Sequence, residues 1–171
     1  MPVEIERKFL VLGDAWRREV VRSRHMAQGY LAGPPSSRCS VRVRVAGEEA
    51  WLNIKSATPG VERDEYEYPI PLADAERLLA TLAGDQVEKI RHDIERDGHV
   101  FEIDEFLGAN EGLVVAEIEL AHADEVFARP AWLGREVSDL ERYYNVNLAT
   151  RPYSLWTADE RAAQVRAERS A

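Results

Sequence analysis

Close to the start of the chain lies Glu4-Ile5-Glu6-Arg7-Lys8-Phe9-Leu10-Val11, where charged and apolar residues alternate over much of the run. Its apolar residues predict a β-strand, yet Glu4, Glu6 and Lys8 occupy alternate positions within it. Alternation places all three charges on one face of a strand. A solvated face of an antiparallel sheet explains one such strand. The interpretation therefore depends on whether other strands repeat the pattern.

The same pattern of charges recurs along the chain. Further predicted strands carry Arg42 and Arg44, Lys55, Glu65 and Glu67, Lys89 and Arg91, Glu102 and Asp104, and Glu117 and Glu119. Like charges two residues apart on one face repel each other, so each pair needs an opposite charge or a ligand. Purely basic and purely acidic pairs on so many strands favour a sheet that curls until its charged face lines an interior.

The residues between these charges, which face the other side of each strand, are mostly apolar, and we expect helices to cover them. The apolar positions are Ile5, Val43, Ile54, Tyr66, Ile90, Ile103 and Ile118. A short helix is expected from Asp14, with Trp16, Val20 and Val21 facing inward, and a second after Pro71. A third is expected over 123–129, closed by Pro130, and a fourth over about 157–169, opened by a capping box of Thr157 and Glu160.

Composition narrows the class of protein. The chain has 171 residues and a formal net charge of -9, from 22 basic against 31 acidic residues. This balance disfavours nucleic acid as a partner, and no apolar stretch is long enough to span a membrane. The single Cys39 and the lack of a secretory signal pattern lead us to expect a cytoplasmic protein. The sequence leaves the oligomeric state open, a homodimer included.

The ordered set of motifs carries a resemblance to a known family. Glu4-x-Glu6-x-Lys8, followed in order by the charged pairs named above, resembles the signature of the CYTH, or triphosphate tunnel metalloenzyme, superfamily. A segment from Gly134 to Ser138 and the run Arg142-Tyr143-Tyr144-Asn145 are similar to the conserved tail of that family. Leu140-Glu141 departs from the Gly and Asp common there, and Ser138 stands where Thr is common.

The resemblance implies an α+β fold that is mainly antiparallel β: a closed eight-stranded tunnel barrel with a charged lumen, covered by a few helices. We expect one domain over 1–171, with the tunnel core at about 1–152. Members of the family bind the triphosphate group of their substrates in the lumen together with Mg²⁺ or Mn²⁺. Their activities include inorganic triphosphatase, thiamine triphosphatase, RNA triphosphatase and class IV adenylate cyclase.

Carried onto this chain, the resemblance assigns a chemical role to each charged pair. The cations that would bind phosphate are Lys8, Arg42, Arg44, Lys55, Lys89 and Arg91, with Arg63 at a strand entrance as a further candidate. The carboxylates favoured as metal ligands are Glu4, Glu6, Glu117 and Glu119, followed by Glu102 and Asp104. Glu65 and Glu67 would orient these cations or position the attacking water.

Three functions remain open from the sequence. The favoured one is a metal-dependent phosphohydrolase acting on inorganic tripolyphosphate, or on a thiamine or nucleoside triphosphate. An adenylate cyclase would need a nucleoside pocket, which no sequence feature marks. A non-catalytic polyphosphate-binding module would gain nothing from so many carboxylates. Trp51 shares the phase of Lys55, which would place its indole in the lumen or at the tunnel rim. An indole that stacks there on an organic triphosphate would overturn the preference for inorganic tripolyphosphate.

Overall fold

The computed structural model describes residues 3–33, 36–56 and 62–161 of the chain. Antiparallel strands dominate this part. They are β1 (Val3–Val11), β2 (Arg22–Ala32), β3 (Cys39–Ala46), β4 (Glu49–Ser56), β5 (Glu62–Pro69), β6 (Gln86–Arg96), β7 (His99–Phe106), β8 (Val114–Glu119) and β9 (Leu133–Glu136). The helices are α1 (Leu72–Thr81), α2 (Asn145–Thr150) and the single 3₁₀ turns η1 (Ala15–Arg18), η2 (Gly108–Asn110), η3 (Glu141–Tyr143) and η4 (Tyr153–Leu155).

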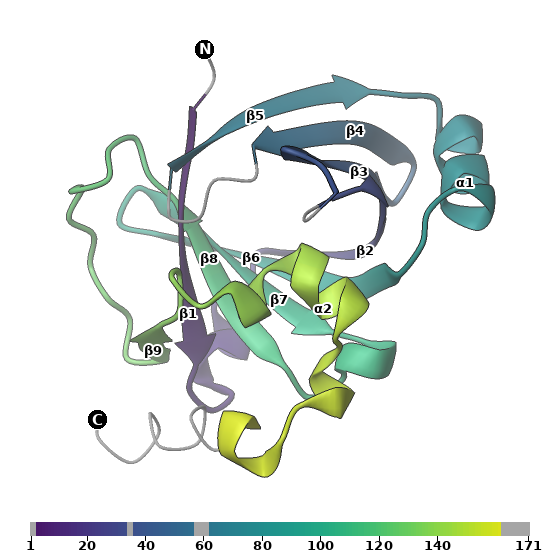
Figure 1. The fold of residues 1–171 in the computed structure, drawn as a ribbon. Helices are drawn as coiled ribbons and strands as arrows, with labels where there is room; N and C mark the ends of the chain where they lie inside the picture. The colour runs from purple at the N-terminus through teal and green to yellow at the C-terminus, as the bar shows by residue number, and fades with distance from the viewer. Residues whose placement is uncertain (1–2, 34–35, 57–61, 162–171) are drawn as a thin grey trace.

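The strands pair into a ring. Within the described residues the order is β5-β4-β3-β2-β6-β7-β8-β1-β9, and a further pairing joins β5 to β1. In that pairing Val3 lies opposite Asp64 and Ile5 opposite Glu62. In Figure 1, β3, β4 and β5 arch over one side of the barrel, while β6, β7 and β8 form the wall below. The short β9 pairs with the other end of β1.

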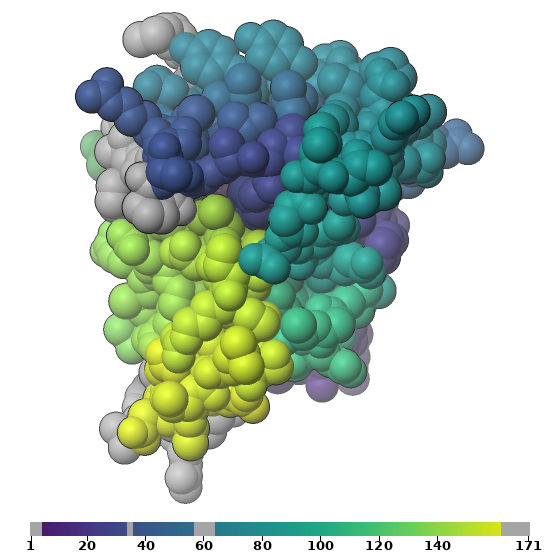
Figure 2. Space-filling model, turned by 45° about the vertical axis from the view of Figure 1, so that its right-hand side comes forward, coloured from purple at the N-terminus to yellow at the C-terminus, as the bar shows by residue number. Residues whose placement is uncertain are grey.

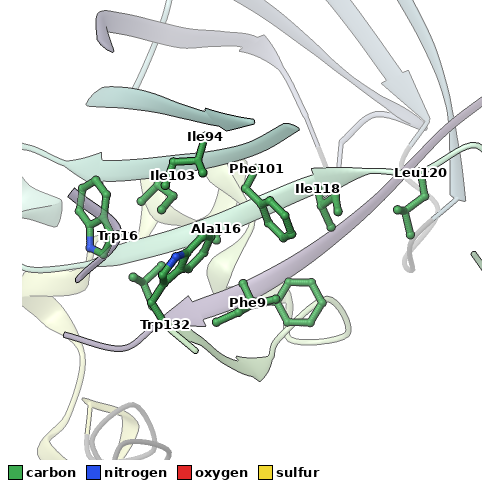
Figure 3. Close-up of a cluster of buried hydrophobic side chains, with 11 residues drawn as sticks. Phe9, Trp16, Ile94, Phe101, Ile103, Ala116, Ile118, Leu120 and Trp132 are labelled. Atoms are coloured by element: carbon green, nitrogen blue, oxygen red, sulfur yellow. The ribbon is translucent and has the colours of Figure 1, made fainter. Parts of the chain in front are cut away.

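The outer face of one wall packs into the main apolar core. Phe9, Phe101, Ile103 and Ile118 come from three neighbouring strands and are almost completely buried. Figure 3 shows these side chains together with Trp16 and others of the cluster. The apolar phase of β1, β7 and β8 therefore faces away from the barrel interior, which leaves the charged phase facing inward.

Helix α1 covers the outer face of β3 and β4. Ala75 and Leu79 of the helix pack against Val43 and Ala50. The close approach depends on Gly29 of β2, because a Cβ there would lie 2.7 Å from the Cβ of Ala83. The predicted helix after Pro71 is confirmed by α1.

The C-terminal segments close one end of the barrel. On the inward phase the charged residues give way to Leu10, Val87, Phe106 and Val115, and these pack against residues after 136. The covering side chains are Val137, Tyr143, Leu148 and Trp156. Figure 2 shows this yellow-green part of the chain lying directly below the blue strands β3 and β4. The inward face thus changes from apolar at this end to charged further along.

Several expected helices differ from the structure. Residues 123–129 are not helical, because the ring of Phe127 packs edge-on against Phe9 and Phe101 and the Glu125 carboxylate accepts a hydrogen bond from the Ala121 N–H. The short helix after Asp14 is the single turn η1; Trp16 is buried, but Val21 is 59% exposed.

The predicted capping box at the C-terminal helix is present. The Thr157 N–H donates to the Glu160 carboxylate at 2.8 Å, and the Glu160 N–H donates to the Thr157 hydroxyl at 3.3 Å. Residues 158–161 are helical, and the remainder of the helix expected to 169 lies outside the described residues. None of the helices in the described part is long and apolar enough to cross a membrane.

Two features of the sheet also differ from expectation. Strand β2 was not anticipated, although it pairs with both β3 and β6 and completes the ring. Tyr66 was expected to be covered on the outer face, yet it is 38% exposed, and its neighbour Tyr68 on the same face is 53% exposed. The outer face of β5 is therefore open where we expected packing.

Candidate active site

The barrel encloses a cavity of about 580 Å³. Most of the charged residues singled out in the sequence line it. They are Glu6, Lys8, Arg42, Arg44, Lys55, Glu65, Glu67, Lys89, Arg91, Glu102, Glu117 and Glu119. The side chains of Glu4 and Arg63 lie outside the described part of the chain. Asp104 is not a lining residue: it is completely buried behind Lys89 and Arg91.

The wall built by β6, β7 and β8 is a compact network of charges. Arg91 donates to both oxygens of Asp104, at 2.7 Å each, and to Glu117 at 2.5 Å. It also contacts Glu102, and Lys89 pairs with Asp104. Register explains the arrangement, because Arg91 lies opposite Asp104 and Glu102 opposite Glu117. The acidic pairs of β7 and β8 thereby hold the basic pair of β6.

Lys8 joins this network from β1. Its ammonium lies 2.6 Å from the Glu117 carboxylate and 3.9 Å from that of Glu6. It also donates to the carbonyl oxygen of Tyr143 at 3.3 Å, which ties the C-terminal cover to the site. Lys8 lies opposite Glu117 in the register of β1 and β8. The alternation in the opening motif thus delivers Lys8 to the cavity.

The wall built by β3, β4 and β5 is arranged in a similar way. Arg44 donates to Glu67 at 2.6 Å, and the Lys55 ammonium lies 3.4 Å from Glu65. Arg42 is buried, 4.0 Å from the Glu65 carboxylate, and its Nε has no hydrogen-bond partner among the described residues. Asn53 lies between the two carboxylates and donates to Glu65 at 3.1 Å and to Glu67 at 2.5 Å.

Enclosure and charge shift the pKa values of the residues in the cavity wall. Removal from water, reinforced by the neighbouring Arg91 guanidinium, lowers the pKa of Lys89 to about 8. Enclosure alone would raise the pKa of Glu117, but Lys8 and Arg91 hold it well below its usual range. Enclosure and the nearby Arg42 lower the pKa of Arg44. Basic groups crowded in this way are stabilised by an anion.

The carboxylates of β1 and β8 suit a hard divalent cation. Glu6 lies directly opposite Glu119 in register, and both line the cavity. Two like charges facing each other are unfavourable unless a cation lies between or near them. No group of three His, Cys, Asp or Glu side chains within the described ranges forms a ready-made metal site. The donor set fits Mg²⁺ or Mn²⁺, which bind through few carboxylates and complete their coordination with substrate oxygens and water.

Sequence reasoning missed the uncharged part of the wall. Met26, Gln28 and Tyr30 of β2 line the cavity, as do Ser40 and the segment 144–146 at the start of α2. The β2 residues alternate as the charged pairs do, but they carry no charge that would mark them. The segment 144–146 falls partly within the tail that resembles the family, and this was the only signal for it.

The charged cavity agrees with what a comparison with known protein families finds. A model of the CYTH domain matches residues 2–153. The chain belongs to the CYTH domain family. The match includes the barrel strands described above and the C-terminal cover as far as Tyr153. The resemblance inferred from the order of the charged motifs is confirmed.

Two relatives named inorganic triphosphatase match most of this CYTH chain. It is 44% identical over 154 residues to an inorganic triphosphatase of Acetivibrio thermocellus, covering 90% of this chain and 97% of the relative. It is 37% identical over 149 residues to an inorganic triphosphatase of Nitrosomonas europaea, covering 85% and 96%. A solved structure of the inorganic triphosphatase NE1496 superposes with a TM-score of 0.62 at 34% identity, covering 92% of this chain and 97% of that one.

Proposed function

We propose that this CYTH protein is a divalent-metal-dependent inorganic triphosphatase that hydrolyses the terminal phosphoanhydride of tripolyphosphate. The observation that carries the proposal is the cavity itself, where basic side chains from several strands face carboxylates placed in pairs. The names of the two relatives, which are similar over nearly their whole length, support the same activity.

Six cations hold the phosphate chain in this proposal. Lys8, Lys89 and Arg91 act from one wall, and Arg42, Arg44 and Lys55 act from the other. Triphosphate carries several negative charges, so removing it from water requires this many fixed positive groups. Arginine fits phosphate oxygens in a bidentate manner. Arg63 remains a candidate from the strand entrance.

The carboxylates divide into two roles. Asp104, Glu102 and Glu117 already contact Arg91, and we assign Asp104 to orienting Arg91 and Lys89. Glu6 and Glu119 would hold Mg²⁺ or Mn²⁺. Glu4 and Glu117, from the same two strands, are further candidate ligands, and Glu117 already contacts Lys8. The metal, when bound, neutralises charge on the phosphate oxygens and makes the phosphorus more electrophilic.

The reaction is an in-line displacement at the terminal phosphorus. A water oxygen bonds to phosphorus while the bridging P–O bond breaks, so that pyrophosphate leaves with the electron pair and one water proton, and orthophosphate keeps the other. Arg42, Arg44 and Arg91 stabilise the equatorial oxygens as charge spreads over them. Glu65 and Glu67 fix the arginines of their wall, or position the water, without forming a covalent intermediate.

The test is a panel of substrates with Mg²⁺ or Mn²⁺. Phosphate release is measured from tripolyphosphate, ATP and thiamine triphosphate, and cyclic AMP is assayed alongside. We expect the highest kcat/KM for tripolyphosphate, no cyclic AMP, and loss of turnover in excess chelator. A preference for an organic triphosphate, cyclic AMP formation, or turnover that survives chelation would contradict the proposal.

A further inference from the structure

Arg44 is held by an aromatic ring that the catalytic roles above do not use. Its guanidinium carbon lies 5.0 Å from the centre of the Trp51 ring. The contact follows from register, because Arg44 of β3 lies directly opposite Trp51 of β4. An arginine placed over an indole face is attracted by the negative face of the ring.

A carboxylate holds the same guanidinium from β5. Arg44 donates to Glu67 at 2.6 Å, and Asn53 holds that carboxylate with a hydrogen bond of 2.5 Å. Asn53 is completely buried, whereas the Glu67 side chain is 39% exposed, so the buried amide fixes a carboxylate that lies at the edge of the cavity wall. Burial and the neighbouring Arg42 lower the pKa of Arg44, so its charge depends on the groups that hold it.

From these contacts we infer that Trp51 is a positioning residue for Arg44, and that its ring serves this arginine rather than an organic part of the substrate. The inference rests on the proposed triphosphatase function and narrows it to substrates made of phosphate alone. A base or thiazolium that stacked on the face under Arg44 would have to displace a guanidinium already fixed by Glu67.

A double-mutant cycle between Trp51 and Arg44 tests this inference. Trp51→Leu should lower kcat/KM for tripolyphosphate about tenfold, the size expected for a partly desolvated cation–π contact. In an Arg44→Ala background the same change should have less than a twofold effect. Trp51→Phe keeps an aromatic face and should restore most of the loss, which a packing defect alone would not allow.

The matched control is Tyr68→Leu. Tyr68 is an exposed aromatic residue of β5 that lies opposite Leu52 of β4, on the outer face of the sheet. Tyr68→Leu should leave kcat/KM for tripolyphosphate unchanged. If Trp51→Leu weakens turnover equally with and without Arg44, or if ATP hydrolysis falls while tripolyphosphate hydrolysis is spared, the inference is wrong. Should Trp51→Leu lower the melting temperature markedly, the binding measurement described next, which uses only wild type and Trp51→Phe, decides the question.

The outcome is distinguishable from failure of the proposed function. Wild-type hydrolysis of tripolyphosphate tests the function, whereas the cycle tests the role of the ring. A readout without turnover is also available, because Trp16, Trp132 and Trp156 are buried, whereas Trp51 is half-buried against Arg44, which lines the cavity. Binding of the non-hydrolysable imidotriphosphate with Mg²⁺ should change tryptophan emission in wild type, but not in Trp51→Phe. Emission that changes equally in both would contradict the assignment of the ring.

Discussion

Lys89 gives the site a dependence on pH that can be measured. Its pKa of about 8 in the folded protein lies below the ordinary value of 10.5. Above pH 8 the ligand-free enzyme loses this charge, so we expect kcat/KM for tripolyphosphate to fall, mainly through a rise in KM. Lys89→Arg, which does not titrate in this range, should remove that limb of the profile. If kcat/KM of Lys89→Arg still falls above pH 8, a group other than Lys89 causes the fall.

The same group has the opposite effect on folding. Between pH 8 and 10.5 the unfolded chain binds a proton at Lys89 that the folded protein has lost. The contribution of Lys89 to the free energy of unfolding of the ligand-free protein should therefore rise with pH over this window. Denaturant unfolding of wild type and Lys89→Met at several pH values measures the difference. A Lys89 contribution that falls as the pH rises would show that its charge is stabilised in the fold.

Arg42 should contribute to catalysis more than to folding. It is buried in the cavity wall, 4.0 Å from the Glu65 carboxylate, so we expect the substrate to supply a stronger contact than this one. We expect Arg42→Ala to lower kcat/KM about 100-fold or more, as for loss of a charge-assisted contact in the transition state. Arg96→Ala, which removes an outer pair with Glu19, is the control and should be neutral. A kcat/KM for Arg42→Ala close to wild type would place the phosphate elsewhere.

Among the elements, α1 packs so closely on β2 that a side chain added at Gly29 should lower the stability of the fold. A Cβ at Gly29 would meet Ala83 at 2.7 Å and Leu79 at 2.9 Å. Gly29→Ala should destabilise the protein by about 1–3 kcal/mol through overpacking. Gly84→Ala is the matched control, because nothing lies within 4 Å of its Cβ position. Denaturant unfolding compares the two; equal stabilities would mean that α1 moves away at little cost.

The elements that could be predicted from the sequence are those with a strong pattern. Charged pairs on β1, β3 and β5 to β8, and the apolar spacing of α1, marked these elements directly. The outer phase of strand β2 is mostly small: Ala27 and Gly29 let α1 approach, and only Leu31 adds a large apolar side chain. The stability of β2 comes from pairing on both edges, which a single sequence does not reveal.

The candidate site, too, could be predicted from the sequence only in part. Charge and phase identified the cavity-lining cations and carboxylates, but not which carboxylate holds an arginine. That depends on cross-strand register, which places Asp104 opposite Arg91 and Glu6 opposite Glu119. Residues 123–129 were predicted helical because local spacing was considered without the aromatic pocket that holds Phe127.

At the scale of the whole molecule, the charge network should couple ligand binding to stability. The cavity gathers basic groups that repel one another, as the lowered pKa values of Lys89 and Arg44 indicate. Imidotriphosphate with Mg²⁺ at about 100 times its Kd should stabilise the fold by about 2.7 kcal/mol, or roughly 5–10 °C in Tm. Arg91→Ala should reduce this gain at the same ligand concentration. A Tm unaffected by the ligand would exclude binding to the folded protein.

We expect one phosphate chain and a divalent cation to occupy the barrel between its two charged walls. Crystals grown with imidotriphosphate and Mn²⁺ test it most directly, because the anomalous signal locates the metal. We predict density for the phosphate chain against Arg42, Arg44 and Arg91, with the manganese peak beside Glu6 and Glu119. A phosphate chain bound outside the barrel, or manganese held only by residues away from these carboxylates, would contradict the account.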